Sequence, residues 1–310
     1  MKKLLTISLL MLMGLSAIAQ TKQTYEYAIK DTCRLKMDVY APAKQNEQHA
    51  CLIYSFGGGF INGSRNDTAQ VNPAKRWALE HGFVFVAIDY RLGLKGVKNL
   101  SVVSGIKNFQ RAIDMAAEDL IDATNYILKH LLKTSQYTIN PNYIVTMGCS
   151  AGAITSLQAD YFLGNRTHNA TQLPDTFHYA GGMSFAGGIF SSDGRVKYRV
   201  QPPAPTLFCH GTEDNLVNYK QTEFANISFY GSHAIVKRFE KYDYPYFFRR
   251  YREMGHEVSI VFFIHGKMME DFVNEYVFQK QHLKIDESYR NPGLDKYRWK
   301  NYKVKDLKGM

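Results

Sequence analysis

The sequence predicts an α/β fold in a single domain, with a mainly parallel central sheet flanked by helices. Short runs of nearly continuous apolar residues alternate along the chain with stretches in which apolar residues recur every three or four positions. The first pattern is typical of strands buried on both faces, and the second of amphipathic helices. Of the 310 residues, 45% are hydrophobic, so the chain can bury a large core and is not disordered as a whole.

The alternation of strands and helices predicts that successive strands run parallel and are joined by crossover helices. Five apolar runs are predicted strands: residues 51–56, 83–90, 143–148, 179–185 and 206–210. One helix is predicted from the stripe Ala112, Ala116, Leu120, Ala123, Ile127 and Leu131. A second begins directly after Ser150 and runs to about residue 162, and a third covers residues 257–278.

The first residues have the pattern of a secretory signal peptide. Lys2 and Lys3 precede the largely apolar run 4–15, and the small residues at 17–19 supply an A-x-A cleavage site. The alternative is a membrane anchor, but the run is shorter than the roughly 20 residues that a span needs. We therefore expect residues 1–19 to be removed and the protein to be secreted or periplasmic, with no membrane span.

Residues 148–152 form the string G-x-S-x-G, with Ser150 at its centre. A predicted strand precedes the string and a predicted helix follows it, which is the context of a nucleophile elbow. On such a turn the serine side chain is exposed, and the flanking glycines relieve crowding. Ser150 is therefore the candidate nucleophile. Cys149 is the alternative, because thiolates are stronger nucleophiles, but its place in the string points it away from the site.

Three consecutive glycines, Gly57, Gly58 and Gly59, follow the first apolar strand. Glycines let the backbone turn its N–H groups toward a small anion. A phosphate-binding loop would end in G-K-[ST], which is missing here. The position of the loop ahead of the nucleophile predicts an oxyanion hole, formed by N–H groups of these glycines together with that of Ala151.

These strings resemble those of the α/β-hydrolase esterases and lipases that carry an H-G-G-G loop. Residues 56–60 match the loop, with Phe56 in place of the histidine, and residues 89–92 match the family's Y-R-L string. Residues 148–152 match the elbow, and the resemblance covers roughly residues 35–280. It implies the α/β-hydrolase fold and the cleavage of carboxylic esters. In the family, this histidine supports the backbone of the loop. Its replacement by Phe56 therefore weakens the assignment to the subfamily more than it weakens the expectation of esterase activity.

The family places an acid and then a histidine after the nucleophile. Residues 210–217 resemble its H-G-x-x-D-x-x-V string, which places Asp214 in the acid position. The acid fixes the tautomer of the catalytic histidine and stabilises its charged form.

Two histidines lie in the right region for the base. In one interpretation residues 246–252 form the last strand, and His256 follows it in a loop. In the other the strand is 258–264 and His265 follows. We favour His256, because the helical apolar pattern continues through 258–264.

The resemblance implies a serine hydrolase that forms an acyl-enzyme, with small-molecule or glycan esters as substrates, and the signal peptide implies that it is exported. Acetyl and feruloyl groups on polysaccharides are the candidates. The alternatives are a serine peptidase of the same fold and a non-catalytic binding protein. We expect no metal and no cofactor, because neither H-E-x-x-H nor a cysteine pair at zinc-ligand spacing occurs. The sequence does not indicate an oligomeric state.

The chain carries a net charge of +10, and the excess is concentrated in residues 237–252 and 281–310. Such a local excess does not indicate nucleic-acid binding, and solvation of a surface is favoured over binding of an acidic glycan. We expect the hydrolase domain to span residues 20–282, and residues 283–310 to form a basic tail packed on it.

Overall fold

The computed structural model describes residues 22–43, 47–98 and 102–298. The predicted signal peptide, residues 1–19, lies outside the described residues, as do residues 299–310 of the predicted tail.

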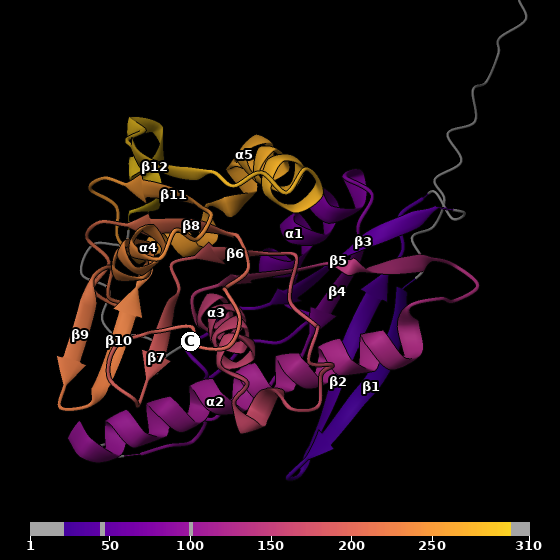
Figure 1. Ribbon diagram of the computed structural model, residues 1–310, viewed down its shortest axis with the longest axis horizontal. Coiled ribbons are helices and arrows are strands. Elements are labelled where there is room, and N and C mark those ends of the chain that lie inside the picture. Colours follow the sequence, from indigo (N-terminus) through magenta and orange to yellow (C-terminus); the bar gives the residue numbers. More distant parts are fainter. Residues whose placement is uncertain (1–21, 44–46, 99–101, 299–310) are drawn as a thin grey trace, which may run out of the picture.

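A nine-stranded sheet forms the centre of the molecule, in the order β1-β2-β4-β3-β5-β6-β8-β11-β12 (Figure 1). The first two pairs in this order, β1 with β2 and β2 with β4, are antiparallel, and the six other pairs are parallel. This confirms the predicted α/β fold with a mainly parallel sheet. The strands are β1 (Lys22–Lys30), β2 (Cys33–Tyr40), β3 (Gln48–Ser55), β4 (Val84–Ile88), β5 (Thr138–Cys149), β6 (Gly181–Phe185), β8 (Thr206–Gly211), β11 (Tyr246–Tyr251) and β12 (Lys284–Tyr289).

Helices cover both faces of this sheet. Figure 1 shows α1 and α5 on one side and α2 and α3 on the other. The helices are α1 (Thr68–Glu80), α2 (Val102–Tyr126), α3 (Ala151–Asn165), α4 (Ser232–Lys241) and α5 (Gly266–Phe272), with π-helical turns η1 (Ile127–Leu131) and η5 (Val273–Phe278) directly after α2 and α5.

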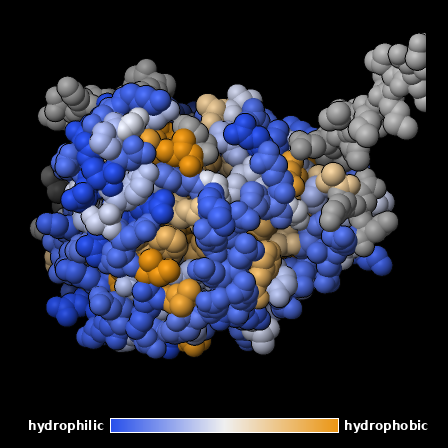
Figure 2. Space-filling view, turned by 90° about the horizontal axis from the view of Figure 1, so that it is seen from above, coloured by the Kyte–Doolittle hydropathy of each residue, from blue (hydrophilic) through white to orange (hydrophobic). Residues whose placement is uncertain are grey.

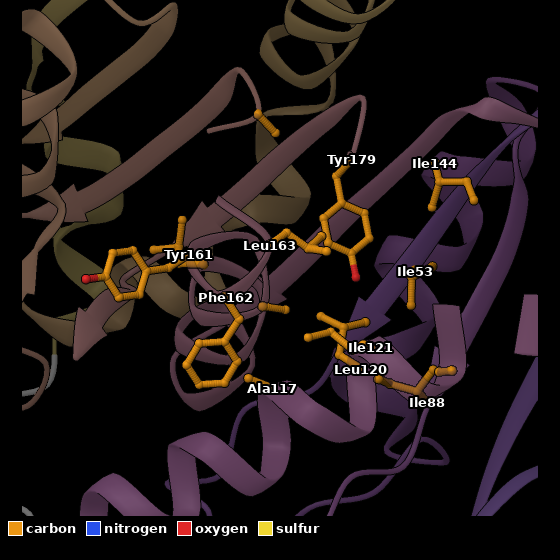
Figure 3. Packing of buried hydrophobic residues seen from close by; sticks show 14 of the residues in the cluster. Ile53, Ile88, Ala117, Leu120, Ile121, Ile144, Tyr161, Phe162, Leu163 and Tyr179 are labelled. Carbon is orange, nitrogen blue, oxygen red and sulfur yellow. The ribbon is translucent and has the colours of Figure 1, made fainter. Parts of the chain in front are cut away.

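The central strands are buried on both faces, so their side chains divide between two cores. In β3, Cys51 and Ile53 pack in the core beneath α2 and α3, while Leu52 and Tyr54 pack in the core beneath α1 and α5. Figure 3 shows the first core, where side chains of α2 and α3 meet those of the sheet. Because both faces are apolar, these strands appear in the sequence as continuous apolar runs.

A second, three-stranded antiparallel sheet has the order β7-β10-β9. Its strands are β7 (Gly188–Ser191), β9 (Gln221–Phe224) and β10 (Ile227–Gly231). Gln158 of α3 joins β7 to the main body, since its side chain donates to the Phe190 carbonyl at 3.0 Å and accepts from the Phe190 N–H at 2.9 Å.

The helix predicted over residues 257–278 is wrong in its first part. The 3₁₀ turns η3 (His256–Ile260) and η4 (Phe262–Ile264) occupy this stretch, and a regular α-helix begins only at Gly266. The alternative strand over residues 258–264 is not present either. Apolar residues three and four positions apart fit successive 3₁₀ turns as well as a helix, which explains the difference.

The start of the predicted tail belongs to the sheet, because β12 pairs with β11 along its whole length. Further short 3₁₀ turns occur at η2 (His168–Ala170) and, after β12, at η6 (Pro292–Tyr297). The two basic segments therefore lie side by side, and acids of β12 pair with their arginines: Arg249 with Glu287, and Arg250 with Asp286.

Within the described ranges, none of the helices combines the length and the apolar character that crossing a bilayer requires. The face shown in Figure 2 is largely hydrophilic, with hydrophobic residues in separate groups. The large hydrophobic side chains that are exposed come from different elements: Ile29, Val200, Tyr242, Ile264 and Phe278.

Candidate active site

Ser150 lies between the end of β5 and the start of α3, in a strained backbone conformation. Its φ of 53° and ψ of −121° lie outside the regions that L-residues normally adopt. Strain of this kind persists only where the surrounding structure holds it, and it is concentrated at functional sites. Here the Ser150 N–H donates to the Phe185 carbonyl at 2.9 Å, and its carbonyl accepts from the Ile154 N–H at 3.0 Å.

The two glycines of the elbow are required by close backbone contacts. A Cβ atom on Gly148 would lie 2.2 Å from the carbonyl carbon of Gly152, and one on Gly152 would lie 2.0 Å from the Ser55 carbonyl oxygen. Distances below 3 Å are not tolerated between a Cβ and backbone atoms. The string G-x-S-x-G therefore lets β3, β5 and α3 meet closely beneath the serine.

The structure brings Ser150, His256 and Asp214 into one hydrogen-bonded chain. His256 Nε2 lies 2.8 Å from Ser150 Oγ, and His256 Nδ1 lies 2.8 Å from Asp214 Oδ2. The three residues follow β5, β11 and β8, whose carboxyl ends lie at the same edge of the sheet. An ionised carboxylate only accepts, so Nδ1–H donates to Asp214 and Nε2 is left to accept from the Ser150 hydroxyl.

Asp214 is buried but has four hydrogen-bond partners. Oδ1 accepts from the N–H groups of Leu216 and Val217 at 2.9 and 3.0 Å. Oδ2 accepts from His256 and lies 3.2 Å from His210 Nε2. Burial raises the pKa of this carboxyl, but the hydrogen bonds from His210 and His256 outweigh it and hold the pKa of Asp214 well below its usual range. The group is therefore an anion at neutral pH.

His210 has a place beside the candidate acid that the sequence analysis did not identify. Its Nε2–H points at two acceptors, Asp214 Oδ2 and the Val217 carbonyl, the latter at 3.0 Å. Its Nδ1 accepts from Ser232 Oγ at 2.8 Å. The spacing of histidine and aspartate in the H-G-x-x-D string is the only sequence signal for this contact.

His265, the alternative base, has different partners. Its Nδ1 lies 3.4 Å from a terminal nitrogen of Arg249, and its ring packs edge-on against Tyr251 and Tyr289. Burial, and after it the positive charge of Arg249, lower the pKa of His265 to about 4. Of the two candidate histidines, the structure thus places His256 against Ser150.

Cys149 is buried in the core on the α1 and α5 side, where its Sγ accepts a hydrogen bond from the Tyr54 hydroxyl at 3.7 Å. Burial raises the pKa of this thiol to about 12, so it stays protonated at neutral pH. These facts agree with the prediction of Cys149 as a small buried hydrophobe.

The structure of the glycine loop corrects the prediction of Gly57 as an oxyanion donor. The Gly57 N–H already donates to Gln70 Oε1 at 2.7 Å, and Gln70 Nε2 donates to Asp67 Oδ2 at 2.8 Å. This N–H is therefore occupied by the protein itself. Sequence reasoning missed Gln70, because a single amide in the following helix carries no motif.

Three of the predicted donors remain. Gly58 and Gly59 have φ values of 137° and 63°, which favour glycine, and both line the cavity in front of Ser150. Ala151 begins α3, so its N–H has no partner within the helix. In the described part of the chain, no hydrogen bond uses the N–H of Gly58, Gly59 or Ala151.

Phe56, which replaces the histidine of the H-G-G-G loop, is buried and stacks on Tyr90. Their ring centroids lie 4.3 Å apart at an interplanar angle of 17°. The Tyr90 hydroxyl also donates to the Phe56 carbonyl at 2.7 Å. Support for the loop thus comes from the Asp89–Leu92 segment that matches the family's Y-R-L string, which accounts for the missing histidine.

Two cavities meet at Ser150, and both are also bordered by Gly59 and Leu216. The polar cavity has a volume of about 440 Å³. The polar side chains that line this cavity and not the other are Asn62, Asp67, Gln70, His256 and Ser259, and Cys149 and Ile260 line it as well. The apolar cavity has a volume of about 350 Å³. The side chains that line this cavity and not the other are Phe60, Ile61, Leu94, Phe109, Ile154 and Val217.

Among the residues that the structure describes, no group of three or more His, Cys, Asp or Glu side chains is placed to hold a metal ion.

Comparisons with known proteins bear on the family and the fold of the chain. Residues 37–176 match the model of the BD-FAE family, which is a family of α/β-hydrolase esterases. None of the curated proteins matches the sequence.

Solved structures of a thermophilic esterase, Est2 from the Planctomycetes species Thermogutta terrifontis, are similar in fold. The native form superposes with a TM-score of 0.59 at 18% identity, over 83% of this chain and 93% of that chain. The propionate-bound form and the form phosphorylated by paraoxon each give 0.59 at 19% identity, over 83% of this chain and 95% of theirs. The chain thus shares the α/β-hydrolase fold with these esterases, and its residues 37–176 match an esterase family.

Proposed function

We propose that the protein is an exported serine carboxylesterase that works through Ser150, His256 and Asp214. His256 Nε2 takes the proton from Ser150 Oγ as the oxygen attacks the ester carbonyl. Asp214 stabilises the imidazolium that forms, and the N–H groups of Gly58, Gly59 and Ala151 stabilise the oxyanion. His256 then protonates the leaving alcohol, and a water molecule hydrolyses the acyl-enzyme by the same route.

The observation that carries this proposal is the position of the His256 ring, 2.8 Å from both Ser150 Oγ and Asp214 Oδ2. A base within hydrogen-bond reach of the nucleophile, and itself oriented by a third group, is the geometry that nucleophilic catalysis needs. The positive φ of Ser150 and the free amides facing the cavities support the same role.

The substrates that we propose are esters of hydroxyl-rich alcohols, such as acetyl or feruloyl esters on polysaccharides. The polar cavity beside His256 supports this class, because amide, carboxylate and hydroxyl groups line it and can exchange hydrogen bonds with sugar hydroxyls. Export, expected from residues 1–19, would bring the enzyme to glycans outside the cytoplasm. The similar Est2 has been solved with propionate and butyrate, which are short acyl groups.

The test of the chemistry is a pair of variants assayed on an aryl ester and with a fluorophosphonate probe. We expect Ser150→Ala to lower kcat by a factor on the order of 10⁴–10⁶ and to abolish labelling. Cys149→Ala is the matched control, and it should keep both activity and labelling. A dead Cys149→Ala enzyme beside an active Ser150→Ala enzyme would contradict the assignment.

Substrate class and export need separate measurements. Acetylated and feruloylated xylan should be deacylated with a higher kcat/KM than a simple ethyl ester of the same acid. Faster cleavage of peptide bonds than of esters would instead favour a peptidase of the same fold. For export, the N-terminus of protein recovered from the periplasm or medium should begin at about residue 20, and an intact Met1 would contradict it.

A further inference from the structure

We propose that the apolar cavity is the acyl-binding site and that it selects apolar acyl groups larger than acetyl, with Phe109 setting its depth. This assignment rests on the proposed function, because it states which half of the ester lies on which side of Ser150. Of the acyl groups proposed above, it therefore disfavours acetyl. Its consequence is a substrate with two unlike halves, an apolar acid and a hydroxyl-rich alcohol.

The position of His256 determines which cavity holds the acyl chain and which holds the alcohol. When Ser150 Oγ is bonded to the carbonyl carbon, the oxyanion points at the N–H groups of Gly58, Gly59 and Ala151. Two substituents remain, the leaving oxygen and the acyl chain. The leaving oxygen takes its proton from His256 Nε2, so it lies on the side that His256 borders. His256 borders the polar cavity and does not border the apolar one. The acyl chain therefore points into the apolar cavity.

The size and lining of this cavity define the acyl group. Its volume of about 350 Å³ equals that of roughly ten water molecules. The methyl of an acetyl group would fill only a small part of it. The lining beyond Ser150 is formed by backbone and by aliphatic and aromatic side chains, so each further buried CH₂ group should raise kcat/KM by roughly fourfold until the cavity is full.

Phe109 closes the cavity from the side of α2. Its ring contacts those of Phe60, Phe190 and Phe229, with centroid distances of 6.1, 6.5 and 6.0 Å. Phe190 belongs to β7 and Phe229 to β10, so the second sheet backs the ring without lining the cavity itself. Truncating Phe109 would open the cavity toward these two rings.

The test is a chain-length series of p-nitrophenyl esters, from acetate to octanoate, measured for the wild type and two cavity variants. In the wild type, kcat/KM should rise from acetate at least to butyrate. Phe109→Ala should move the optimum to a longer chain. Leu94→Trp adds volume to the half-buried lining of the cavity, and we expect it to lower kcat/KM for hexanoate at least tenfold while acetate changes less than threefold.

Two control variants isolate the effect. Phe278→Ala removes an equal ring that is 40% exposed and lies outside both cavities at Ser150. Ser259→Ala alters the polar cavity alone. Both should leave the chain-length profile unchanged.

The assignment would be overturned by an unchanged profile in Phe109→Ala, or by a profile that shifts in Ser259→Ala. A folded wild type that hydrolyses no ester and takes no fluorophosphonate label would overturn the proposed function, and this assignment with it. A labelled wild type that prefers acetate would overturn only the acyl assignment.

Discussion

His256 and His265 are nine positions apart on the segment that follows β11, and both are buried, at 5% and 7% exposure. The charges beside the two rings nevertheless have opposite signs. The His256 ring lies between the Asp214 carboxylate and the Ser150 hydroxyl. The His265 ring lies beside the Arg249 guanidinium and packs against the rings of two tyrosines. The two rings are almost equally buried and come from the same segment, so the difference between them comes from the charge beside each.

That charge decides what each imidazole can do. A carboxylate at Nδ1 stabilises the imidazolium, so His256 can take a proton from a nucleophile and hold it through the reaction. A guanidinium opposes protonation in addition to the cost of burial, and the pKa of His265 is lowered to about 4. His265 is thus a neutral packing residue at neutral pH.

The largest expected effect is on activity, and it separates the two histidines directly. His256→Ala should lower kcat for an aryl ester by a factor on the order of 10⁴–10⁶, because the serine loses its base. His265→Ala should leave kcat within about threefold when assayed well below its melting temperature. Full activity of His256→Ala would contradict the proposed base, and circular dichroism of both variants would show whether each is folded.

A smaller effect is expected from changing the charge beside each ring. Asp214→Asn keeps the shape of the side chain but removes its charge, and we expect kcat to fall by a factor on the order of 10²–10⁴. Arg249→Gln removes the cation beside His265 and should leave kcat within about threefold.

Asp214→Asn and Arg249→Gln together test whether the charged group beside a histidine determines that the histidine can act as a base. If Arg249→Gln lost activity as strongly as Asp214→Asn, the contrast between the two histidines would not hold. A pH–rate profile of each folded variant would show whether the loss comes from the ionisation of the base.

The sequence predicts this contrast only in part. The central strands β3, β5 and β8 were predictable, because strands buried on both faces are continuous apolar runs. The choice of His256 followed from an argument about helical periodicity. The 3₁₀ turns between His256 and His265 were mistaken for the start of a helix, since the two structures share apolar spacings.

Other features lacked a local signal. The edge strand β12 alternates between exposed and half-buried residues, so it has no apolar run. Gln70 acts through a contact to Gly57, which lies 13 positions away, and no pattern of residue types marks this pair. For the contact of His210 with Asp214, four positions away, the H-G-x-x-D string is the only signal. Arg249 was recognised as part of a basic strand, but its contact with His265 depends on how the 3₁₀ turns fold back onto β11.

The smallest expected effect concerns stability and follows from the lowered pKa of His265. In the unfolded chain a histidine titrates near pH 6.5, whereas in the folded protein the pKa of His265 is about 4. Between these two values the unfolded state binds one more proton, so the contribution of His265 to stability is present above pH 6.5 and is lost as the pH falls toward 4. The loss should approach about 3 kcal/mol, at 1.36 kcal/mol per pKa unit.

His265→Gln removes this titration while keeping a polar side chain of similar size. Urea unfolding at several pH values should therefore show that the stability difference between wild type and variant shrinks or reverses as the pH falls from 7 to 4. Other titrating groups, including the buried Asp160, whose pKa is raised to about 7 by burial, are common to both proteins and cancel in the difference. The exposed His178 provides the matched control, His178→Gln, which should show no such trend. A difference for His265→Gln that stays constant with pH would mean that Arg249 and burial do not hold this ring neutral, and the contrast with His256 would then rest on hydrogen bonding alone.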